Sequence, residues 1–150
     1  MDPRTTPKRL KSKPTWLINQ LSTHAHRVID ERLRAANIAH RSHYSLLAAL
    51  AESGPTSQAD LGRRIGLDRS DVTAAVNELE RQGALERAAD PADRRRNVVS
   101  ITPAGQEQLD AMDVQLGEAQ DELLAPLSAA ERAELIRMLT ALLGHHAPTD

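Results

Sequence analysis

The sequence predicts a mainly α-helical protein with one small β-hairpin, organised as a winged helix-turn-helix between flanking helices. Two short helical patterns, separated by little more than Gly66, predict the helix-turn-helix. Two short strand patterns with a turn-rich loop between them follow at once and predict the hairpin, or wing. The apolar composition also favours helices, because it consists of Leu, Ile, Val, Ala and Met with one Trp, one Tyr and no Phe.

The chain begins with a basic segment and two predicted helices. Residues 1–13 contain Pro3 and Pro7 and show no apolar periodicity, so we expect a flexible basic arm. Pro14 suits the first turn of a helix that runs to about Ala36. The apolar positions of this helix follow helical spacing: Leu17, Ile18, Leu21, Ala25, Val28, Ile29, Leu33 and Ala36. A second helix begins at about Ser42 and ends at the Gly-Pro breaker of residues 53–55.

The helix-turn-helix is predicted from residue 57 to residue 83. Ser57 and Asp60 have the spacing of a capping box, with Asp in place of the usual Glu, and Gly66 ends this short helix. Asp68 is the expected N-cap of the second helix, and Gly83 lies where a glycine commonly follows a helix end. The buried stripe of the second helix is expected to be Val72, Val76 and Leu79.

The wing and two further helices complete the chain. Strands are predicted at residues 84–89 and 97–102, joined by the loop "DPADRRR". Thr102 and Pro103 are typical of the start of a helix, which extends to about Leu124 before Pro126 interrupts it. Ser128 and Glu131 then form a capping box. The last helix is apolar over a face broader than one small core needs, which predicts packing against both its own subunit and a partner: Leu135, Ile136, Leu139, Leu142 and Leu143.

Composition excludes several classes of function. The absence of cysteine excludes disulfide scaffolds, thiolate metal sites and thiol nucleophiles. The sequence has no Gly-rich phosphate loop and no Ser/His/Asp arrangement on a recognisable elbow, so we expect neither an enzyme nor a cofactor. No apolar run approaches the ~18 residues of a membrane span, and the basic N-terminus lacks the apolar centre of a signal peptide. We therefore expect a cytoplasmic protein without membrane association.

The net charge of −2 conceals a segregation of charge along the chain. Residues 1–56 hold nine Lys/Arg and four Asp/Glu, whereas residues 103–150 hold two and nine. Such segregation can present a basic face even on an acidic protein, and ordinary solvated helices are the alternative interpretation.

Residues 61–105, "LGRRIGLDRSDVTAAVNELERQGALERAADPADRRRNVVSITPAG", resemble the winged-helix core of the MarR family of bacterial transcription regulators. The segment "DPADRRRNVVSIT" matches that family's wing, in which an Asp-x-Arg near the tip precedes a strand ending in Leu/Ile-Thr. The flanking helices also fit, so the resemblance covers nearly the whole chain. It implies one MarR-like domain over residues 14–150, with a DNA-binding lobe at 42–102 and dimerisation helices at 14–40 and 103–146.

The N-terminal end of the second helix of the helix-turn-helix is the expected point of base contact, because one helix fits the major groove of DNA. Ser70 and Thr73 can hydrogen-bond phosphates or bases, and Arg69 can reach guanine or phosphate. Asn77 can contact adenine, and capping or solvent exposure is the alternative role of these residues. Many relatives carry Arg or Lys after this Thr, whereas Ala74 here leaves room for a thymine methyl group.

The wing carries three consecutive arginines, which suit the negative potential of a minor groove. By resemblance, Asp93 and Arg95 occupy the family's Asp-x-Arg positions, and we expect Arg95 to approach the groove. Arg94 and Arg96 are expected on phosphate or on Asp93, while Asp90 and Asp93 brace the turn. A solvated charged loop is the alternative. Further phosphate contacts are open to the basic arm and to Arg63 and Arg64.

Effector binding is expected by resemblance, because MarR-like proteins bind a small, often aromatic and anionic, molecule between the dimer helices and the winged helix. Trp16, His43 and Tyr44 are the candidate lining residues, with core packing as the alternative. No metal site is assigned to the six histidines, although a zinc-responsive regulator stays open as an alternative function.

These observations predict a homodimeric, ligand-responsive repressor that binds a pseudo-palindromic operator in double-stranded DNA and is released by its effector. The other alternative is a winged helix that has become a protein-interaction module. The three arginines of the wing favour DNA, because a protein-binding wing has no need of them.

Overall fold

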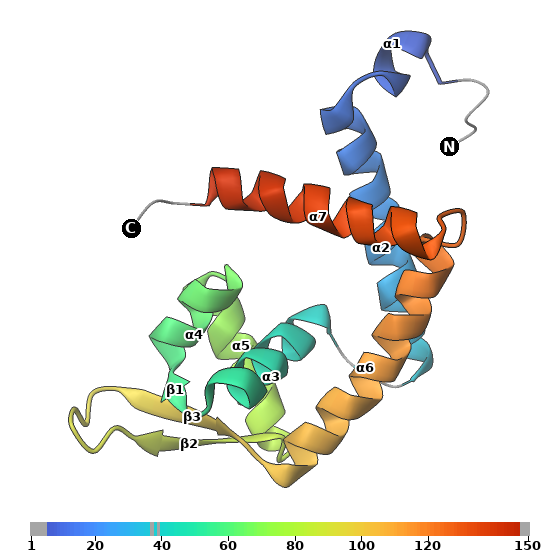
Figure 1. Ribbon diagram of the computed structural model, residues 1–150. Helices are drawn as coiled ribbons and strands as arrows, with labels where there is room; N and C mark the ends of the chain where they lie inside the picture. The colour runs from blue at the N-terminus through green and yellow to red at the C-terminus, as the bar shows by residue number, and fades with distance from the viewer. Residues whose placement is uncertain (1–5, 37, 39, 148–150) are drawn as a thin grey trace.

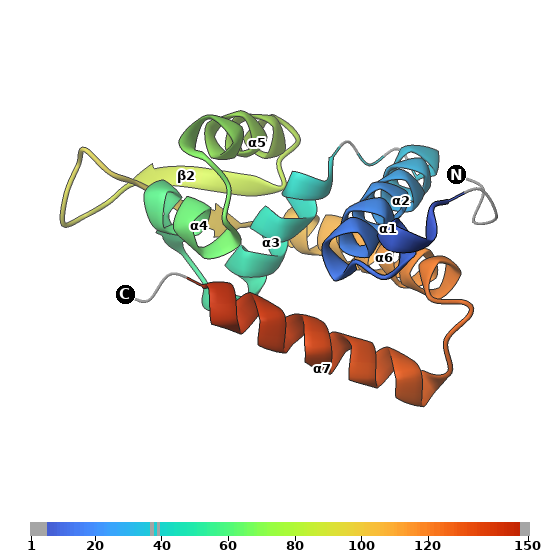
Figure 2. The ribbon, with the colours of Figure 1, turned by 90° about the horizontal axis from the view of Figure 1, so that it is seen from above.

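The computed structural model describes residues 6–36, 38 and 40–147, which form a flanking helical region and a central lobe (Figure 1). The flanking region consists of α1 (Lys8–Lys11), α2 (Pro14–Ala35), α6 (Pro103–Leu123) and α7 (Ala129–His146). The central lobe consists of α3 (Arg41–Ser53), β1 (Thr56–Ser57), α4 (Gln58–Ile65), α5 (Arg69–Arg81), β2 (Leu85–Ala89) and β3 (Asn97–Ile101). The loop between β2 and β3 projects from the lobe on the side away from α2 and α6 (Figure 2).

The core of the lobe lies where α3, α4 and α5 pack together against the sheet. Its fully buried side chains include three leucines of α3, two residues of α5 and one residue each of α4, β2 and β3: Leu46, Leu47, Leu50, Leu61, Val76, Leu79, Leu85 and Val99. Gly62 lets α4 and α5 approach closely, since a Cβ atom on it would lie 3.1 Å from Cγ2 of Val72. The two helices of the helix-turn-helix are thereby held rigidly beside each other.

Local sequence signals set the boundaries of α4 and α5 as predicted. The Ser57 side chain accepts a hydrogen bond from the Asp60 backbone N–H, and Gly66 ends α4 in the left-handed conformation at φ 66°. Asp68 caps α5, and Gly83 follows it at φ 71°. The predicted capping box differs in one bond, because the Asp60 carboxylate accepts from the Ser57 hydroxyl at 2.5 Å instead of from its backbone N–H.

The wing belongs to a three-stranded antiparallel sheet within the described residues, with β3 between β1 and β2. Leu85 pairs with Ile101 and Ala89 with Asn97, so both predicted strands form with the predicted hairpin connection. On the other edge, Thr56 pairs with Val99. The sequence did not predict β1, because two residues between Pro55 and the start of α4 are too few to show a strand pattern.

The helices α2 and α6 pack side by side and connect the two ends of the chain (Figure 1). Arg32 of α2 donates to Glu118 at 2.5 Å and to Glu122 at 2.9 Å, and its hydrogen bond to Glu122 raises the pKa of Arg32. The apolar stripe predicted for α2 is buried only toward its C-terminal end, at Val28 and Leu33. The N-terminal half of the stripe is solvent-exposed in this single chain: Leu17, Ile18 and Leu21.

The two ends of the described chain are helical as well. The predicted capping box of Ser128 and Glu131 is present at the start of α7, which turns back from the end of α6 (Figure 2). None of the residues of α7 is buried, so the expected packing of this helix against its own subunit is not present in the single chain. Within the arm that we expected to be flexible, Lys8–Lys11 forms one helical turn, while residues 1–5 lie outside the described part of the chain.

Candidate nucleic-acid interface

A groove of about 640 Å³ lies where the start of α4, the start of α5 and the base of the wing meet. Four arginines line it, one from α4, one from α5 and two from the wing: Arg63, Arg69, Arg95 and Arg96. No carboxylate is among its lining residues, although Asp60 lies beside two of the arginines. The polar residues Gln58, Thr73 and Asn97 complete the lining. A groove with this composition is suited to a polyanion such as a DNA backbone.

The start of α5 is fixed by its N-cap. The Asp68 carboxylate accepts from the backbone N–H groups of Ser70 and Asp71, each at 2.9 Å, and from the Ser70 hydroxyl at 2.7 Å. These bonds stabilise the charged carboxylate, with the Asp71 backbone N–H as the largest cause, and lower the pKa of Asp68. The first turn of α5 is therefore rigid and exposed beside the groove.

Both hydroxyl groups in this turn donate their proton within the protein. The Ser70 hydroxyl donates to Asp68, and the Thr73 hydroxyl donates to the carbonyl oxygen of Arg69 at 2.8 Å. A hydroxyl has one proton, so in this arrangement each can only accept a hydrogen bond from DNA. Phosphate oxygens donate none, and the expected phosphate contacts of Ser70 and Thr73 do not fit this arrangement.

The other predicted residues of α5 lie along its exposed face. Arg69 is exposed and its guanidinium has no hydrogen bond or ion pair within the described chain. Ala74 is exposed, in agreement with a position open to a base edge. The side-chain oxygen of Asn77 accepts from Arg87 of β2 at 2.8 Å, and Arg87 also binds Glu80. The hydrogen bond and charge of Arg87 lower the pKa of Glu80. The bond from Arg87 to Asn77 orients the Asn77 amide, with its oxygen toward β2.

Two aspartates shape the wing, as predicted. The Asp90 carboxylate accepts from the backbone N–H of Ala92 at 2.9 Å, and the Asp93 carboxylate accepts from that of Arg95 at 3.0 Å. Both are bonds from a side chain to the backbone two residues further on, which are typical of Asx-turns. The backbone N–H of Asp90 also donates to the Arg96 carbonyl at 2.9 Å and closes the loop.

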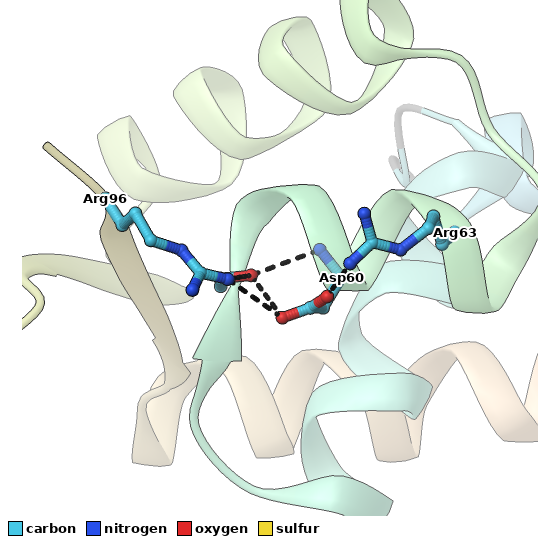
Figure 3. Close-up of polar contacts among 4 residues, drawn as sticks. Asp60, Arg63 and Arg96 are labelled. Carbon is cyan, nitrogen blue, oxygen red and sulfur yellow. Dashed lines mark hydrogen bonds and ion pairs between the residues drawn. The ribbon is translucent and has the colours of Figure 1, made fainter. Parts of the chain in front are cut away.

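The three wing arginines have different environments. The Arg96 guanidinium donates to the Asp60 carboxylate at 3.3 Å and to the Ser57 hydroxyl at 3.2 Å, so it binds α4 (Figure 3). We expected Arg96 on phosphate or on Asp93, and the second of these expectations is wrong. Asp93 is occupied by the turn itself. The side chains of Arg94 and Arg95 are exposed and make no hydrogen bond or ion pair with any described residue.

Asp60 is the centre of a small charged network at the edge of the groove (Figure 3). Its carboxylate accepts from the Ser57 hydroxyl and also binds Arg63 and Arg96. The hydrogen bond from Ser57, helped by the two guanidinium groups, holds the pKa of Asp60 below its usual value. This network connects the wing to α4 and fixes the width of the groove between them.

The three candidate ligand residues do not form one pocket within the described chain. His43 is 1% exposed, its Nδ1 has no hydrogen-bond partner, and burial lowers its pKa. Tyr44 beside it donates to Asp113 of α6 at 2.9 Å, a bond that raises the pKa of Tyr44. Trp16 lies near the start of α2, sixteen residues before Arg32 and about 24 Å from it along the helix axis. Any shared pocket would need a second subunit.

Four of the six histidines lie in two pairs of neighbouring rings. The ring centres of His40 and His43 are 5.5 Å apart, and those of His145 and His146 are 4.9 Å apart. Across the described residues, no group of three or more His, Cys, Asp or Glu side chains is placed to hold a metal ion. Nor is any helix in that part of the chain long and apolar enough to cross a membrane.

Three features of the interface were not predicted from the sequence. They are the bond from Gln58 to Thr73 at 3.0 Å, the attachment of Arg96 to Asp60, and the support of Asn77 by Arg87. These partners are 15, 36 and 10 positions apart, in different elements. A sequence signal was present only for Asp60, which the capping-box spacing places at the start of α4.

Comparison with known proteins agrees with this geometry. A family model described as the MarR family matches residues 40–96. The putative transcriptional regulatory protein for the hcr operon of Thauera aromatica is 34% identical over 99 residues, which are 66% of this chain. The match spans 60% of that relative's own length.

Two further matches extend over more of the chain. The uncharacterized HTH-type transcriptional regulator YdgJ of Bacillus subtilis is 30% identical over 116 residues, 77% of this chain and 71% of that protein. The crystal structure of the PcaV transcriptional regulator from Streptomyces coelicolor, in complex with its natural ligand, matches with a TM-score of 0.78 and 27% identity. That match covers 96% of this chain and 100% of the PcaV chain. With its winged helix-turn-helix and its arginine-lined groove, this chain belongs to the MarR family of transcription regulators.

Proposed function

We propose that this protein is a homodimeric, ligand-responsive repressor that binds a pseudo-palindromic operator through α5 and the wing. The observation that carries the proposal is the groove beside α5, which four guanidinium groups line and no carboxylate does. In the proposed complex the first turn of α5 enters the major groove of DNA. Arg95 at the wing approaches the neighbouring minor groove, where negative potential attracts guanidinium groups.

Homodimerisation is supported by the distribution of exposed apolar side chains. Among the described residues, the exposed large hydrophobic side chains all lie on α1, α2, α6 and α7, and none lies on the central lobe: Leu10, Leu17, Ile18, Leu21, Val114, Ile136, Met138, Leu139, Leu142 and Leu143. An apolar surface of this extent is typical of an interface between subunits. A two-fold dimer would place its two α5 helices on half-sites about 10 base pairs apart. The protein would act on DNA in the cytoplasm.

Release by an effector is supported by the relative PcaV, whose solved structure contains its natural ligand. In this chain, the buried His43 imidazole with its unpaired Nδ1, next to Tyr44, is the polar group available to such a molecule between α3 and the dimer helices. Trp16 of the second subunit would complete the pocket. Ligand binding there would change the separation of the two lobes, and operator affinity would fall because only one separation matches the half-sites.

An electrophoretic mobility assay at two salt concentrations, about 50 and 200 mM, tests the proposal with DNA from upstream of the protein's own gene. We expect Arg95→Ala to weaken binding about ten-fold and to reduce the salt dependence by about one counterion. The matched control is Arg81→Ala, which removes the same charge from the same lobe but lies outside the groove. Equal binding by the wild type and Arg95→Ala would refute the role of the wing. No DNA binding by the wild type would instead favour a protein-interaction module.

A further inference from the structure

The side chain of Gln58, the first residue of α4, crosses to α5 and donates a hydrogen bond from Nε2 to the Thr73 hydroxyl at 3.0 Å. Both residues line the groove between the helix-turn-helix and the wing. Gln58 is half-buried, so its amide lies at the inner wall of the groove beside the first turn of α5. It is thus a polar side chain at the proposed DNA interface that does not belong to α5.

The hydrogen bond that the Thr73 hydroxyl donates determines which atom of the Gln58 amide faces it. The Thr73 hydroxyl gives its one proton to the Arg69 carbonyl at 2.8 Å, so toward Gln58 it can only accept. The Gln58 atom that faces Thr73 must therefore be the nitrogen. The amide oxygen Oε1 and the second N–H of the amide make no hydrogen bond with the described part of the chain.

Oε1 and Nε2 are the neighbouring acceptor and donor of one amide group, and Nε2 keeps one N–H beyond the one that it gives to Thr73. In the major groove, adenine presents the complementary pair, a donor at N6 and an acceptor at N7, and a glutamine amide bonds both at once. Guanine presents two acceptors there and cannot make both bonds with an amide. The amide held by Thr73 is therefore complementary to adenine.

We propose that Gln58 is a specificity-determining residue that contacts an adenine in each operator half-site, with Thr73 as the positioning residue that orients its amide. The proposal rests on the proposed function, because it needs α5 in the major groove. Sequence analysis expected Thr73 to contact phosphates or bases, and the proposal gives the base contact to Gln58 of α4 instead. It also gives a direct base contact to a recognition surface on which Ala74 offers only a methyl group.

Selection from a pool of DNA duplexes with about 20 randomised base pairs tests the proposal without knowledge of the operator. The proteins compared are the wild type, Gln58→Met, Thr73→Val and Thr73→Ser. Methionine keeps the length of glutamine without its hydrogen bonds, and valine keeps the shape of threonine without its hydroxyl. Thr73→Ser is the matched control, because it retains the hydroxyl that accepts from Gln58.

We expect the wild type and Thr73→Ser to enrich a two-fold symmetric motif with a strongly preferred adenine in each half-site. Gln58→Met and Thr73→Val should both lose the preference at that same position, by about ten-fold, and retain the rest of the motif. Affinity for the unselected pool should be unchanged in both, since neither variant alters charge. A double variant should lose no more than either single variant, because the two residues act through one contact.

The outcomes separate this inference from the proposed function. If the wild type enriches a motif and both single variants enrich it unchanged, Gln58 makes no base contact and the inference is wrong. Loss at different positions in the two variants, or additive losses in the double variant, would equally contradict it. A general loss of affinity with lower thermal stability would show that the bond only holds α4 to α5. If the wild type enriches no sequence, the proposed function itself fails.

Discussion

At the start of α6, Gly105 packs directly against the end of the helix-turn-helix. A Cβ atom on Gly105 would lie 1.9 Å from the carbonyl oxygen of Ala84. The Thr102 hydroxyl caps the same turn by accepting from the Gly105 N–H at 3.1 Å, and the Thr102 N–H donates to the Ala84 carbonyl at 3.1 Å. The absence of one side chain thus lets the lobe join α6.

We predict that Gly105→Ala lowers the free energy of unfolding by about 2–3 kcal/mol, because the backbone of Ala84 must move to admit the new methyl group. The matched control lies on the same helix. A Cβ atom on Gly117 would meet no atom within 4 Å, so Gly117→Ala should raise stability by about 0.5–1 kcal/mol through helix propensity. Urea unfolding at one protein concentration measures both. Similar effects of the two substitutions would show that the Ala84 contact is unimportant.

The sequence predicts the role of some of these residues and not of others. The caps Ser57, Asp68 and Thr102 were predicted because a cap acts within three residues of its own position. The constraint on Gly105 was not predicted, since it arises from a carbonyl group 21 positions earlier in the chain. The sequence indicated the hydroxyls of Ser70 and Thr73 but not the atoms that receive their protons, although both acceptors lie within four residues, because the rotation of a hydroxyl leaves no sequence pattern.

At the scale of elements, the wing is a hairpin whose strands belong to the sheet of the lobe, while its loop depends on further attachments at its base. Within the loop, Asp90 and Asp93 form the turns, as their sequence context predicts. Attachment to α4 depends on Arg96, which binds Asp60 and Ser57 (Figure 3). The same Asp60 also holds Arg63, so one carboxylate balances two of the four cations that line the groove.

We predict that Asp60→Asn strengthens binding to random-sequence DNA and makes it more dependent on salt. Loss of the carboxylate frees Arg63 and Arg96 for phosphate contacts, and each new contact adds about 0.9 to the slope of log affinity against log salt. Fluorescence anisotropy titrations with a random duplex at several salt concentrations measure the slope.

The control for this prediction is Glu86→Gln. It changes net charge by the same amount on β2, where Glu86 is exposed and makes no ion pair with described residues. A slope that increases equally in the two variants would attribute the effect to net charge. Weaker binding by Asp60→Asn would instead show that the attachment of the wing matters more than the free guanidinium groups.

At the scale of the whole molecule, part of the segregated charge forms ion pairs within the chain, whereas many apolar side chains of the flanking helices stay exposed. The excess of basic residues in the first 56 positions and of acidic residues after residue 102 is partly used between α2 and α6. There Arg32 binds Glu118 and Glu122. Apolar side chains are left exposed on α2 and α7. The ion pairs of Arg32 join α2 to α6 within one chain. The exposed apolar surface remains available to a second chain.

We predict that Leu139→Glu dissociates the proposed dimer. Leu139 lies on the apolar face of α7 with Ile136 and Leu143, and a buried carboxylate at a subunit interface is unfavourable. The dissociation constant should rise at least about ten-fold in sedimentation equilibrium, and operator affinity should fall with it.

The matched control for the dimer is Ala130→Glu. It adds the same side chain nine residues earlier on α7, two and a half turns away and therefore on the opposite face. A wild-type protein that sediments as a monomer, or a Leu139→Glu variant as dimeric as the wild type, would contradict the proposed interface.

The sequence by itself determined the helices, the hairpin and their order, because helix caps, glycine and proline breakers and apolar periodicity act over a few residues. It also showed that three arginines lie in the wing loop. The wing segment resembles that of the MarR family, and this resemblance indicated the family. Only the tertiary structure decided which groups those side chains meet: Arg96 on Asp60, Gln58 on Thr73, and His43 buried away from Trp16. These contacts join residues that are distant in sequence, so they depend on how the elements pack. Packing depends on the whole apolar core and not on any one local signal.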